Sequence, residues 1–297
     1  MIDQFLGYLR FERNRSELTV KSYRTALEEF EAYFKEQDGD LSWESVDSDV
    51  IRGWMEQLMD RGEKATTVNT KLSAVRSMYR FALTRKMVSK DPSHSIVGPK
   101  KKKPLPVFVR EEEMNKLLDD QKNWKDNYNN VRARTIILLL YETGLRRAEL
   151  IGLNDSDVDL AQHQLKVTGK RDKQRIVPFG DELADVLRHY IEVRNDKVAR
   201  NSNALFLNKH GERITKDLVY KTVRDKLSLV TFMKKRSPHV LRHSFATAML
   251  NNGAGLESVK QLLGHESLET TEIYTHTTFE QLQRVYKEAH PRGAEPL

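Results

Sequence analysis

A proline-rich basic segment at residues 91–106, DPSHSIVGPKKKKPLP, sets the strongest limit on how this chain can fold. Its four prolines exclude a continuous helix, because each lacks a backbone N–H donor and has a fixed φ angle. We therefore expect two domains, residues 1–94 and 107–297, joined by a linker at 95–106. A linker of this composition can act as a solvated hinge, can bind DNA phosphates, or can do both. Its basic residues are Lys100, Lys101, Lys102 and Lys103.

The first domain is expected to be a four-helix bundle. Apolar residues recur at helical spacing in four stretches with short connections between them. The fourth helix starts near Thr66, where hydroxyl groups and a nearby lysine suit phosphate binding at a helix N-terminus. The alternative is that Thr66 and Thr67 only cap the helix. The candidate DNA contacts in this domain are Lys64, Thr66, Thr67, Lys71 and Arg76.

The second domain is expected to be mostly helical with one small β-hairpin. Residues 164–168 and 174–177 have strand character and flank a turn at 169–172. A hairpin tip that carries several cations can enter a groove of DNA or lie along a strand of it. The candidate DNA contacts on this hairpin are Lys170, Arg171, Lys173 and Arg175.

A buried helix is expected over residues 131–141, ending at Thr143–Gly144. Glycine at a helix C-terminus turns the chain sharply. The turn at Gly144 is expected to direct Arg146 into a cleft. The alternative is that Arg146 is a surface residue that pairs with Glu149.

A cationic pair lies on the helix that Pro238 can open. His239 and Arg242 are three residues apart, so they lie on the same side of that helix, one turn apart. Arginine offers a planar fork of donors that fits two phosphate oxygens and stays protonated. The alternative is a packed histidine beside a solvated arginine.

A short helix, a turn at Gly264 and a second helix are expected in SVKQLLGHESLETTEIYTH. His265 follows the turn, and Tyr274 lies near the end of the second helix. A free phenol has a pKa of about 10, so Tyr274 needs clustered cations to act as a nucleophile. The alternative is that Tyr274 belongs to the hydrophobic core.

Three motifs together resemble the tyrosine recombinase (phage integrase) family, and most of all its Xer-type members. They are TGLRxxEL at Arg146, HxLRH at Arg242 and LLGHxSLxTTxxYTH around Tyr274. The resemblance covers nearly the whole chain. It implies site-specific DNA recombination through a 3′-phosphotyrosyl intermediate, with Lys170 as general acid and no cofactor. The catalytic residues that it implies are Arg146, Lys170, His239, Arg242, His265 and Tyr274.

The resemblance also implies an architecture and partners. The fold would be mainly α, with a SAM-like core-binding bundle ahead of a catalytic domain. Four protomers, identical or of two kinds, would act on two double-stranded DNA sites, together with a partner Xer recombinase and a DNA translocase. The last helix, with Phe279, Leu282 and Tyr286, would dock into a neighbouring protomer, or else pack on its own domain. Chromosome dimer resolution is the expected role, with a mobile-element integrase or transposase as the alternative.

Charge and composition agree with a nucleic-acid partner. The net charge is +7 and the pI is near 9.3, which favours a polyanion. The chain has no cysteine, so disulfides and cysteine-based zinc sites are excluded. No signal peptide is recognisable, and the most apolar run, residues 135–141, is too short to span a bilayer. We therefore expect a cytoplasmic protein without membrane contact.

Three other functions remain open from the residues alone. A type IB topoisomerase would cleave DNA in the same way and rejoin the same strand. A non-catalytic DNA-binding regulator would have no need of Tyr274. A metal site would have to use His239, His243, His265 and His276, but a short metal-binding spacing such as HExxH does not occur.

Overall fold

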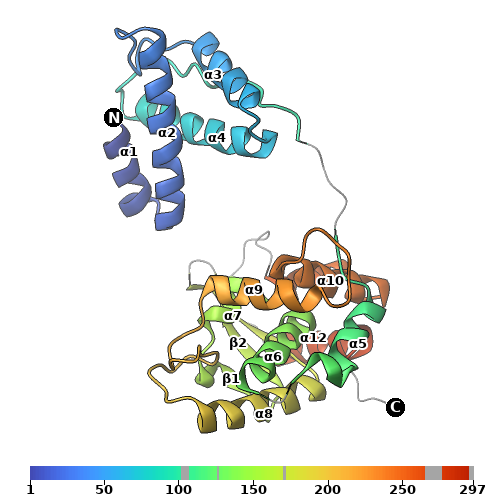
Figure 1. The fold of residues 1–297 in the computed structure, drawn as a ribbon. Helices are drawn as coiled ribbons and strands as arrows, with labels where there is room; N and C mark the ends of the chain where they lie inside the picture. Colours follow the sequence, from blue (N-terminus) through green and yellow to red (C-terminus); the bar gives the residue numbers. More distant parts are fainter. Residues whose placement is uncertain (102–106, 126, 170–171, 265–275, 294–297) are drawn as a thin grey trace. The chain divides into compact units, whose positions relative to one another are not determined.

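The computed structural model describes residues 1–101, 107–125, 127–169, 172–264 and 276–293, with the side chains of 276–281 excepted. The chain forms two compact units, Met1–Pro104 and Leu105–Leu297 (Figure 1). Each unit buries a hydrophobic cluster of its own. The expected mainly helical fold with one small sheet is confirmed.

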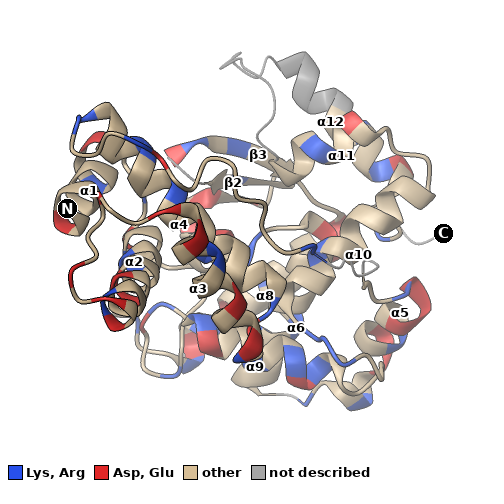
Figure 2. Ribbon diagram, turned by 90° about the horizontal axis from the view of Figure 1, so that it is seen from above, with Lys and Arg blue, Asp and Glu red and all other residues tan. Residues whose placement is uncertain are grey.

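The first unit is the expected helical bundle. Asp47 caps the third helix by accepting hydrogen bonds from the N–H groups of Asp49 and Val50. Helix α2 carries both acidic and basic residues (Figure 2), with Glu28, Glu29 and Glu31 close together in its second half. The elements are α1 (Ile2–Gly7), the π-helical turn η1 (Tyr8–Glu12), α2 (Glu17–Gln37), α3 (Ser48–Asp60) and α4 (Ala65–Thr84).

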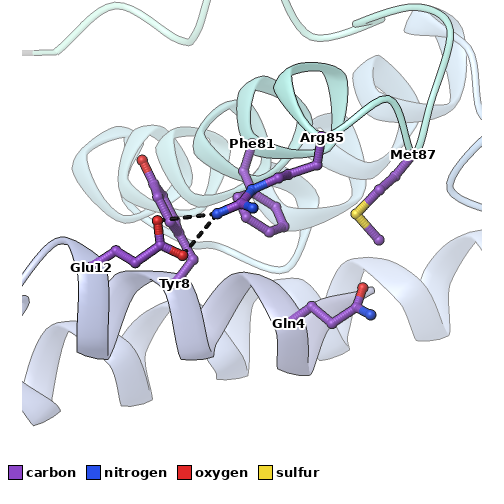
Figure 3. Close-up of a pocket in the computed structure, with 6 residues that line it drawn as sticks. All are labelled: Gln4, Tyr8, Glu12, Phe81, Arg85 and Met87. Atoms are coloured by element: carbon purple, nitrogen blue, oxygen red, sulfur yellow. Dashed lines mark hydrogen bonds and ion pairs between the residues drawn. The ribbon is translucent and has the colours of Figure 1, made fainter.

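A cavity of about 410 Å³ lies between η1 and α4 (Figure 3). The rings of Tyr8 and Phe81 approach to 4.9 Å at its wall. Arg85 donates from Nη2 to both oxygens of Glu12, at 2.8 and 3.1 Å, which ties the end of α4 to η1. Because the Arg85 guanidinium is paired with Glu12, this open pocket offers no unpaired Arg85 charge to an anion.

The first part of the proline-rich segment packs on α4. Arg76 donates to the backbone carbonyls of Ser93 and Ile96, and Asn69 donates to the carbonyl of Pro99 at 2.9 Å. A Cβ atom at Gly98 would lie 2.3 Å from the Asn69 side chain. Residues up to Pro99 are therefore part of the bundle's surface, while Lys100 and Lys101 are exposed.

The second unit is built around α6 (Tyr128–Thr143), whose residues from Thr135 to Thr143 are all buried. The three strands pair antiparallel in the order β1-β2-β3. The expected hairpin is confirmed, whereas the two-residue β1 was not predicted. The unit's helices are α5 (Glu111–Asp119), η2 (Gln121–Asn123), α6, α7 (Arg147–Gly152), η3 (Asp155–Asp157), α8 (Asp181–Lys197), α9 (Lys216–Leu227), α10 (Pro238–Asn251), α11 (Leu256–Leu263) and α12 (His276–Ala289), and its strands are β1 (Val158–Asp159), β2 (Gln164–Thr168) and β3 (Gln174–Pro178).

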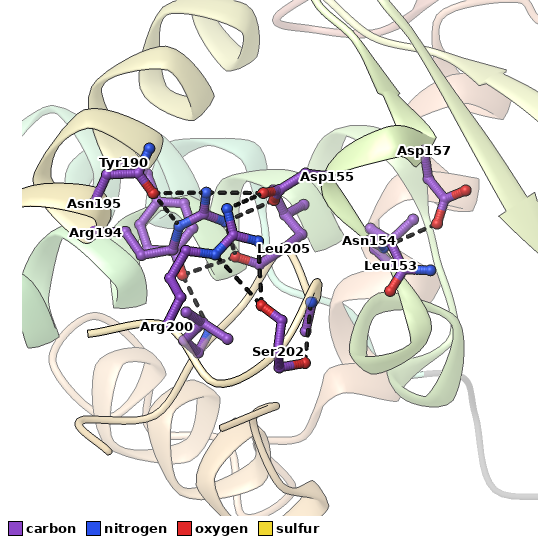
Figure 4. A network of polar contacts seen from close by, with 12 residues as sticks. Leu153, Asn154, Asp155, Asp157, Tyr190, Arg194, Asn195, Arg200, Ser202 and Leu205 are labelled. Atoms are coloured by element: carbon purple, nitrogen blue, oxygen red, sulfur yellow. Dashed lines mark hydrogen bonds and ion pairs between the residues drawn. The ribbon is translucent and has the colours of Figure 1, made fainter. Parts of the chain in front are cut away.

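A buried arginine joins the far end of α8 to the rest of this unit (Figure 4). Arg194 is 0% exposed and donates to both oxygens of Asp155, at 2.7 and 3.0 Å. It also donates to the carbonyl of Leu205 at 2.7 Å. Because every partner is charged or a carbonyl, the buried guanidinium is compensated, and it links α8 to Asp155 and Leu205.

The last helix packs on its own domain. Leu282, Tyr286 and Ala289 of α12 are buried in one cluster with Phe245 and other residues of α10 and α11. The sequence left two arrangements open for this helix, docking into a neighbouring protomer or packing on its own domain. In the single chain it packs on its own domain. None of the helices in the described part of the chain is long and apolar enough to cross a bilayer.

Candidate active site at the end of helix α11

The turn after α6 has the form that the sequence predicted. Gly144 ends the helix in the left-handed region, with φ of +60°. A Cβ atom at this position would lie 2.6 Å from Phe245 and 2.8 Å from Leu263. Only glycine fits both the backbone angle and this close packing. The turn leads directly into Arg146, the N-cap residue of α7.

Arg146 has two partners that lie far apart in the sequence. Its Nη1 donates to Oε1 of Glu149 at 2.7 Å, and its Nη2 donates to the carbonyl of Gly264 at 3.0 Å. The ion pair expected as an alternative is thus present. This ion pair still leaves Arg146 accessible to a ligand, because 39% of the Arg146 side chain remains exposed. Arg146 also contacts Gly264, the residue before His265.

Arg242 extends from α10 to the same place. Its Nη1 donates to the carbonyl of Gly144 at 2.7 Å, and its Nη2 donates to the carbonyl of Leu263 at 2.8 Å. The residue is 8% exposed. Burial, followed by the positive charge of Arg146, lowers the pKa of Arg242 to about 10, although Glu149 acts in the opposite direction. It therefore remains a cation at neutral pH, held close to a second one.

His239 lies one turn before Arg242, and its side chain is exposed to solvent. Partial burial lowers the pKa of His239 below 6.5, and the positive groups of Arg147, His243 and Lys235 lower it further. The imidazole is therefore neutral at pH 7 and can accept a proton.

Three of the six predicted catalytic residues are thus described, and two of them, Arg146 and Arg242, bind adjacent carbonyls. Lys170, His265 and Tyr274 lie outside the described residues, as do three of the predicted DNA contacts, Arg171, Lys102 and Lys103. His265 directly follows Gly264, the residue whose carbonyl Arg146 binds.

Six predicted DNA contacts are exposed. Lys64 is the N-cap residue of α4, and no side chain caps that helix start. The capping role weighed for the two threonines is therefore not seen there. The six are Lys64, Thr66, Thr67, Lys100, Lys101 and Lys173.

Three other predicted contacts bind the protein itself. Lys71 lies between Glu29 and Glu63, with Nζ–O distances of 2.7 and 2.5 Å. Arg76 binds the carbonyls of Ser93 and Ile96. Arg175 is 8% exposed and donates to both oxygens of Glu149, at 3.0 and 2.9 Å. In this structure the charges of these side chains are used inside their own units, contrary to the expectation of surface contacts.

Near Arg146, the sequence reasoning also missed the places of Glu149 and Arg175. Glu149 is 6% exposed and therefore not a surface residue. Arg175 pairs across the sheet with the buried Val167 and shares a strand face with Val177. Since side chains alternate along a strand, the spacing of two between Arg175 and Val177 was the signal that would have placed it inward.

Among the described residues, no group of three or more His, Cys, Asp or Glu side chains could hold a metal ion. Two of the four histidines weighed for a metal site, His265 and the side chain of His276, lie outside them. The arrangement instead suits an anion. Two guanidinium groups held together repel each other, and a phosphate between them relieves that repulsion.

Comparison with known proteins decides the family. The model of the phage integrase family matches residues 107–281, and that of the phage integrase N-terminal SAM-like domain matches residues 2–86. The chain belongs to the phage integrase family. It is a Xer-type tyrosine recombinase, an enzyme that binds DNA and breaks and rejoins its strands. The fold, the family and the recombinase function predicted from the motifs are thereby confirmed.

Individual relatives match the recombinase over nearly its full length. The tyrosine recombinase XerD of Oceanobacillus iheyensis is 37% identical, and the match covers 98% of both chains. The tyrosine recombinase XerC of Chlorobaculum tepidum is 38% identical over 98% of this chain and 94% of the relative. Among solved structures, XerH bound to its palindromic difH substrate has the same fold, with a TM-score of 0.72 and 23% identity over 96% of this chain and 83% of XerH.

Proposed function

We propose that Tyr274 cleaves DNA by transesterification at a phosphate held between Arg146 and Arg242. The observation that carries this proposal is the convergence of the two arginines, from α7 and α10, on the carbonyls of Gly264 and Leu263. Those carbonyls directly precede the segment that contains His265 and Tyr274. A phosphate bound there lies beside the segment that carries the nucleophile.

In the cleavage step, the Tyr274 oxygen attacks phosphorus and the bond to the 5′ oxygen breaks. His239, neutral at pH 7, accepts the phenol proton, and Lys170 gives a proton to the departing 5′ oxygen. Arg146 and Arg242 bind the non-bridging oxygens, and His265 donates a hydrogen bond to one of them. The arginines gain strength as negative charge grows in the transition state.

The product of this step is a 3′-phosphotyrosyl bond and a free 5′-hydroxyl. The bond keeps the energy of the broken ester, so strand joining requires no nucleotide cofactor. A 5′-hydroxyl from the partner duplex then attacks phosphorus and releases Tyr274. Repeating the exchange on the second strand pair gives recombined DNA.

We propose chromosome dimer resolution as the biological role, with four protomers on two DNA sites. Matches to XerC and XerD over at least 94% of each relative support it. A partner Xer recombinase and a DNA translocase belong to the same proposal. Sequencing DNA that is covalently trapped on the enzyme in cells tests it, since a single chromosomal site is expected rather than scattered insertion sites.

The chemical step is tested with suicide duplexes, in which the cleaved strand loses a short fragment and cannot be rejoined. Wild type should accumulate a covalent adduct. Tyr274→Phe should bind the same DNA without forming it, whereas Tyr220→Phe, at an exposed position on α9, should behave as wild type. An adduct that persists in Tyr274→Phe would end the assignment.

A further inference from the structure

Arg175 is buried at the centre of the site rather than exposed at the hairpin tip. Its Nη1 and Nη2 each donate to one oxygen of Glu149, and its Nε donates to the carbonyl of Leu262 at 3.1 Å. All three guanidinium nitrogens are engaged, through three of the five N–H donors. Arg175 therefore joins β3 to α7 and to the end of α11.

Three arginines from three elements bind consecutive carbonyls at the end of α11. Arg175 binds that of Leu262, Arg242 that of Leu263, and Arg146 that of Gly264. The last carbonyls of a helix have no partner within the helix, and their partial negative charge attracts cations. The end of α11 is thus the point that fixes the three side chains relative to one another.

Glu149 connects Arg175 directly to Arg146. Oε1 accepts from Nη1 of both arginines, at 3.0 and 2.7 Å. Oε2 accepts from Nη2 of Arg175 at 2.9 Å and from the backbone N–H of Arg146 at 2.8 Å. Burial alone would raise the pKa of Glu149, but the hydrogen bonds and charge of Arg175, together with Arg146, lower it. Glu149 is therefore a carboxylate with two cationic partners.

Removing Arg175 would change the charge available to a ligand. Three guanidinium groups and one carboxylate sum to +2, whereas two guanidinium groups and one carboxylate sum to +1. A buried carboxylate that lost one cation would depend more strongly on the other. Arg146 would then be held by Glu149 instead of by the ligand.

We propose that Arg175 is a positioning residue for strand cleavage. By neutralising Glu149 and holding the end of α11, it leaves the charge of Arg146 available to the scissile phosphate. This inference rests on the proposed cleavage chemistry, and Arg175 itself touches no DNA. The fit around it is close, because a Cβ atom at Gly264, where φ is +64°, would lie 3.1 Å from the Arg175 guanidinium.

The first test measures single-turnover cleavage of a suicide duplex by the full chain. Arg175→Gln should cleave about 100-fold more slowly, the scale expected when a catalytic group is misplaced. The cleavage rate of Arg175→Lys should lie between those of wild type and Arg175→Gln, because lysine keeps the charge but lacks the planar fork. Arg188→Gln, which removes an arginine 51% exposed on α8, should cleave at the wild-type rate. Wild-type cleavage by folded Arg175→Gln would overturn the proposal.

DNA binding separates positioning from direct contact. The slope of log affinity against log salt falls by about 1 when a protein loses one phosphate contact. Arg175→Gln should keep the wild-type slope. A slope reduced by about 1 would show that Arg175 contacts DNA and would refute the positioning role.

A neutral scissile linkage separates positioning from a general loss of structure. A methylphosphonate in place of the scissile phosphate needs less cationic charge. On it, the deficit of Arg175→Gln should shrink from about 100-fold to within about tenfold. An equal deficit on both linkages would mean that Arg175 supports the fold only.

A double variant covers the case in which Arg175→Gln fails to fold. Arg175→Gln with Glu149→Gln removes the buried carboxylate together with its cationic partner. The cleavage rate of the double variant should exceed that of Arg175→Gln alone. If Arg175→Gln is unfolded, cleavage by the double variant should still be measurable. A folded double variant no faster than a folded single variant would contradict the charge argument. If the wild-type enzyme forms no adduct, the proposed function is wrong. If the wild-type enzyme cleaves and Arg175→Gln cleaves at the same rate, only the inference about Arg175 is wrong.

Discussion

Arg146 and Arg242 bind neighbouring carbonyl oxygens, those of Gly264 and Leu263, although the two arginines are separated by 95 intervening residues. The two carbonyls belong to the end of α11, directly before His265. The position of this helix end therefore decides whether the two guanidinium groups act on one phosphate.

The first prediction concerns the turn that carries Arg146. Gly144→Ala should lower the free energy of unfolding by about 1–3 kcal/mol, because alanine is strained at φ of +60° and its Cβ meets Phe245 and Leu263. Gly152→Ala is the matched control, since a Cβ there meets nothing within 4 Å and the residue is helical. It should be neutral or stabilising. Urea unfolding measures both, and equal stabilities would contradict the packing argument.

The second prediction concerns His239. Since its pKa is lowered, the imidazole is neutral above pH 6.5 and becomes protonated only as the pH falls further. Cleavage by wild type should therefore lose rate below pH 6.5, and His239→Asn should be slower by about 100-fold or more, without that loss. Single-turnover rates between pH 5 and 8 provide the test, and a decline centred above 6.5 would exclude His239 as the base.

The third prediction concerns the contact between α12 and the buried Glu142 of α6. Glu142 is fully buried, and its Oε2 accepts from Tyr286 Oη at 2.9 Å and from the N–H of Gly180 at 3.2 Å. Burial raises the pKa of Glu142 to about 8, above its unfolded value of 4.5. Between pH 4.5 and 8, the Glu142 carboxyl thus binds a proton in the native state that it does not bind in the unfolded state. The contribution of this proton to the free energy of unfolding is complete below pH 4.5 and is lost as the pH rises to 8.

Glu142→Gln should remove this dependence, because the amide oxygen accepts the same two bonds and does not ionise. The free energy of unfolding of the variant, minus that of wild type, should rise between pH 5 and 8, by at most about 1.4 kcal/mol for each pH unit. His290, whose pKa is lowered to about 3, is present in both proteins and cancels in the difference. A difference that does not change with pH would show that Glu142 is ionised throughout.

The fourth prediction separates two lysines of the bundle. Lys64 is exposed at the start of α4, so Lys64→Gln should lower the salt slope of DNA binding by about 1 without a loss of stability. Lys71 is held between Glu29 and Glu63 with 16% of its side chain exposed. Lys71→Gln should keep the slope and destabilise the bundle by about 1–3 kcal/mol. The reverse pattern would mean that Lys71 faces DNA.

Much of the fold was predictable because its signals are local. The amphipathic stripes marked the bundle helices, and Gly144 and Gly264 marked two helix ends, both with positive φ. The strand β1 was missed because two residues carry no recognisable alternation. Likewise, α7 was not predicted, since six residues directly after a turn give too short a periodic pattern.

The site was predictable only in part. Motifs identified Arg146, His239 and Arg242, but they say nothing of which cations the protein keeps for itself. Lys71 and Arg175 were expected on the surface because lysine and arginine are usually exposed. Their carboxylate partners lie 42 and 26 residues away for the pairs with Glu29 and Glu149, so only the folded chain shows the pairing. Counting charged residues along the sequence cannot identify these ion pairs.

Mapping the covalent adduct tests the central claim most directly. Wild-type enzyme is trapped on a suicide duplex and digested, and the peptide that carries the nucleotide is sequenced by mass spectrometry. Our account predicts that the DNA is joined through its 3′ phosphate to Tyr274, and that Arg146→Gln and Arg242→Gln each greatly reduce the amount of adduct. DNA attached to another residue, or through a 5′ phosphate, would contradict it.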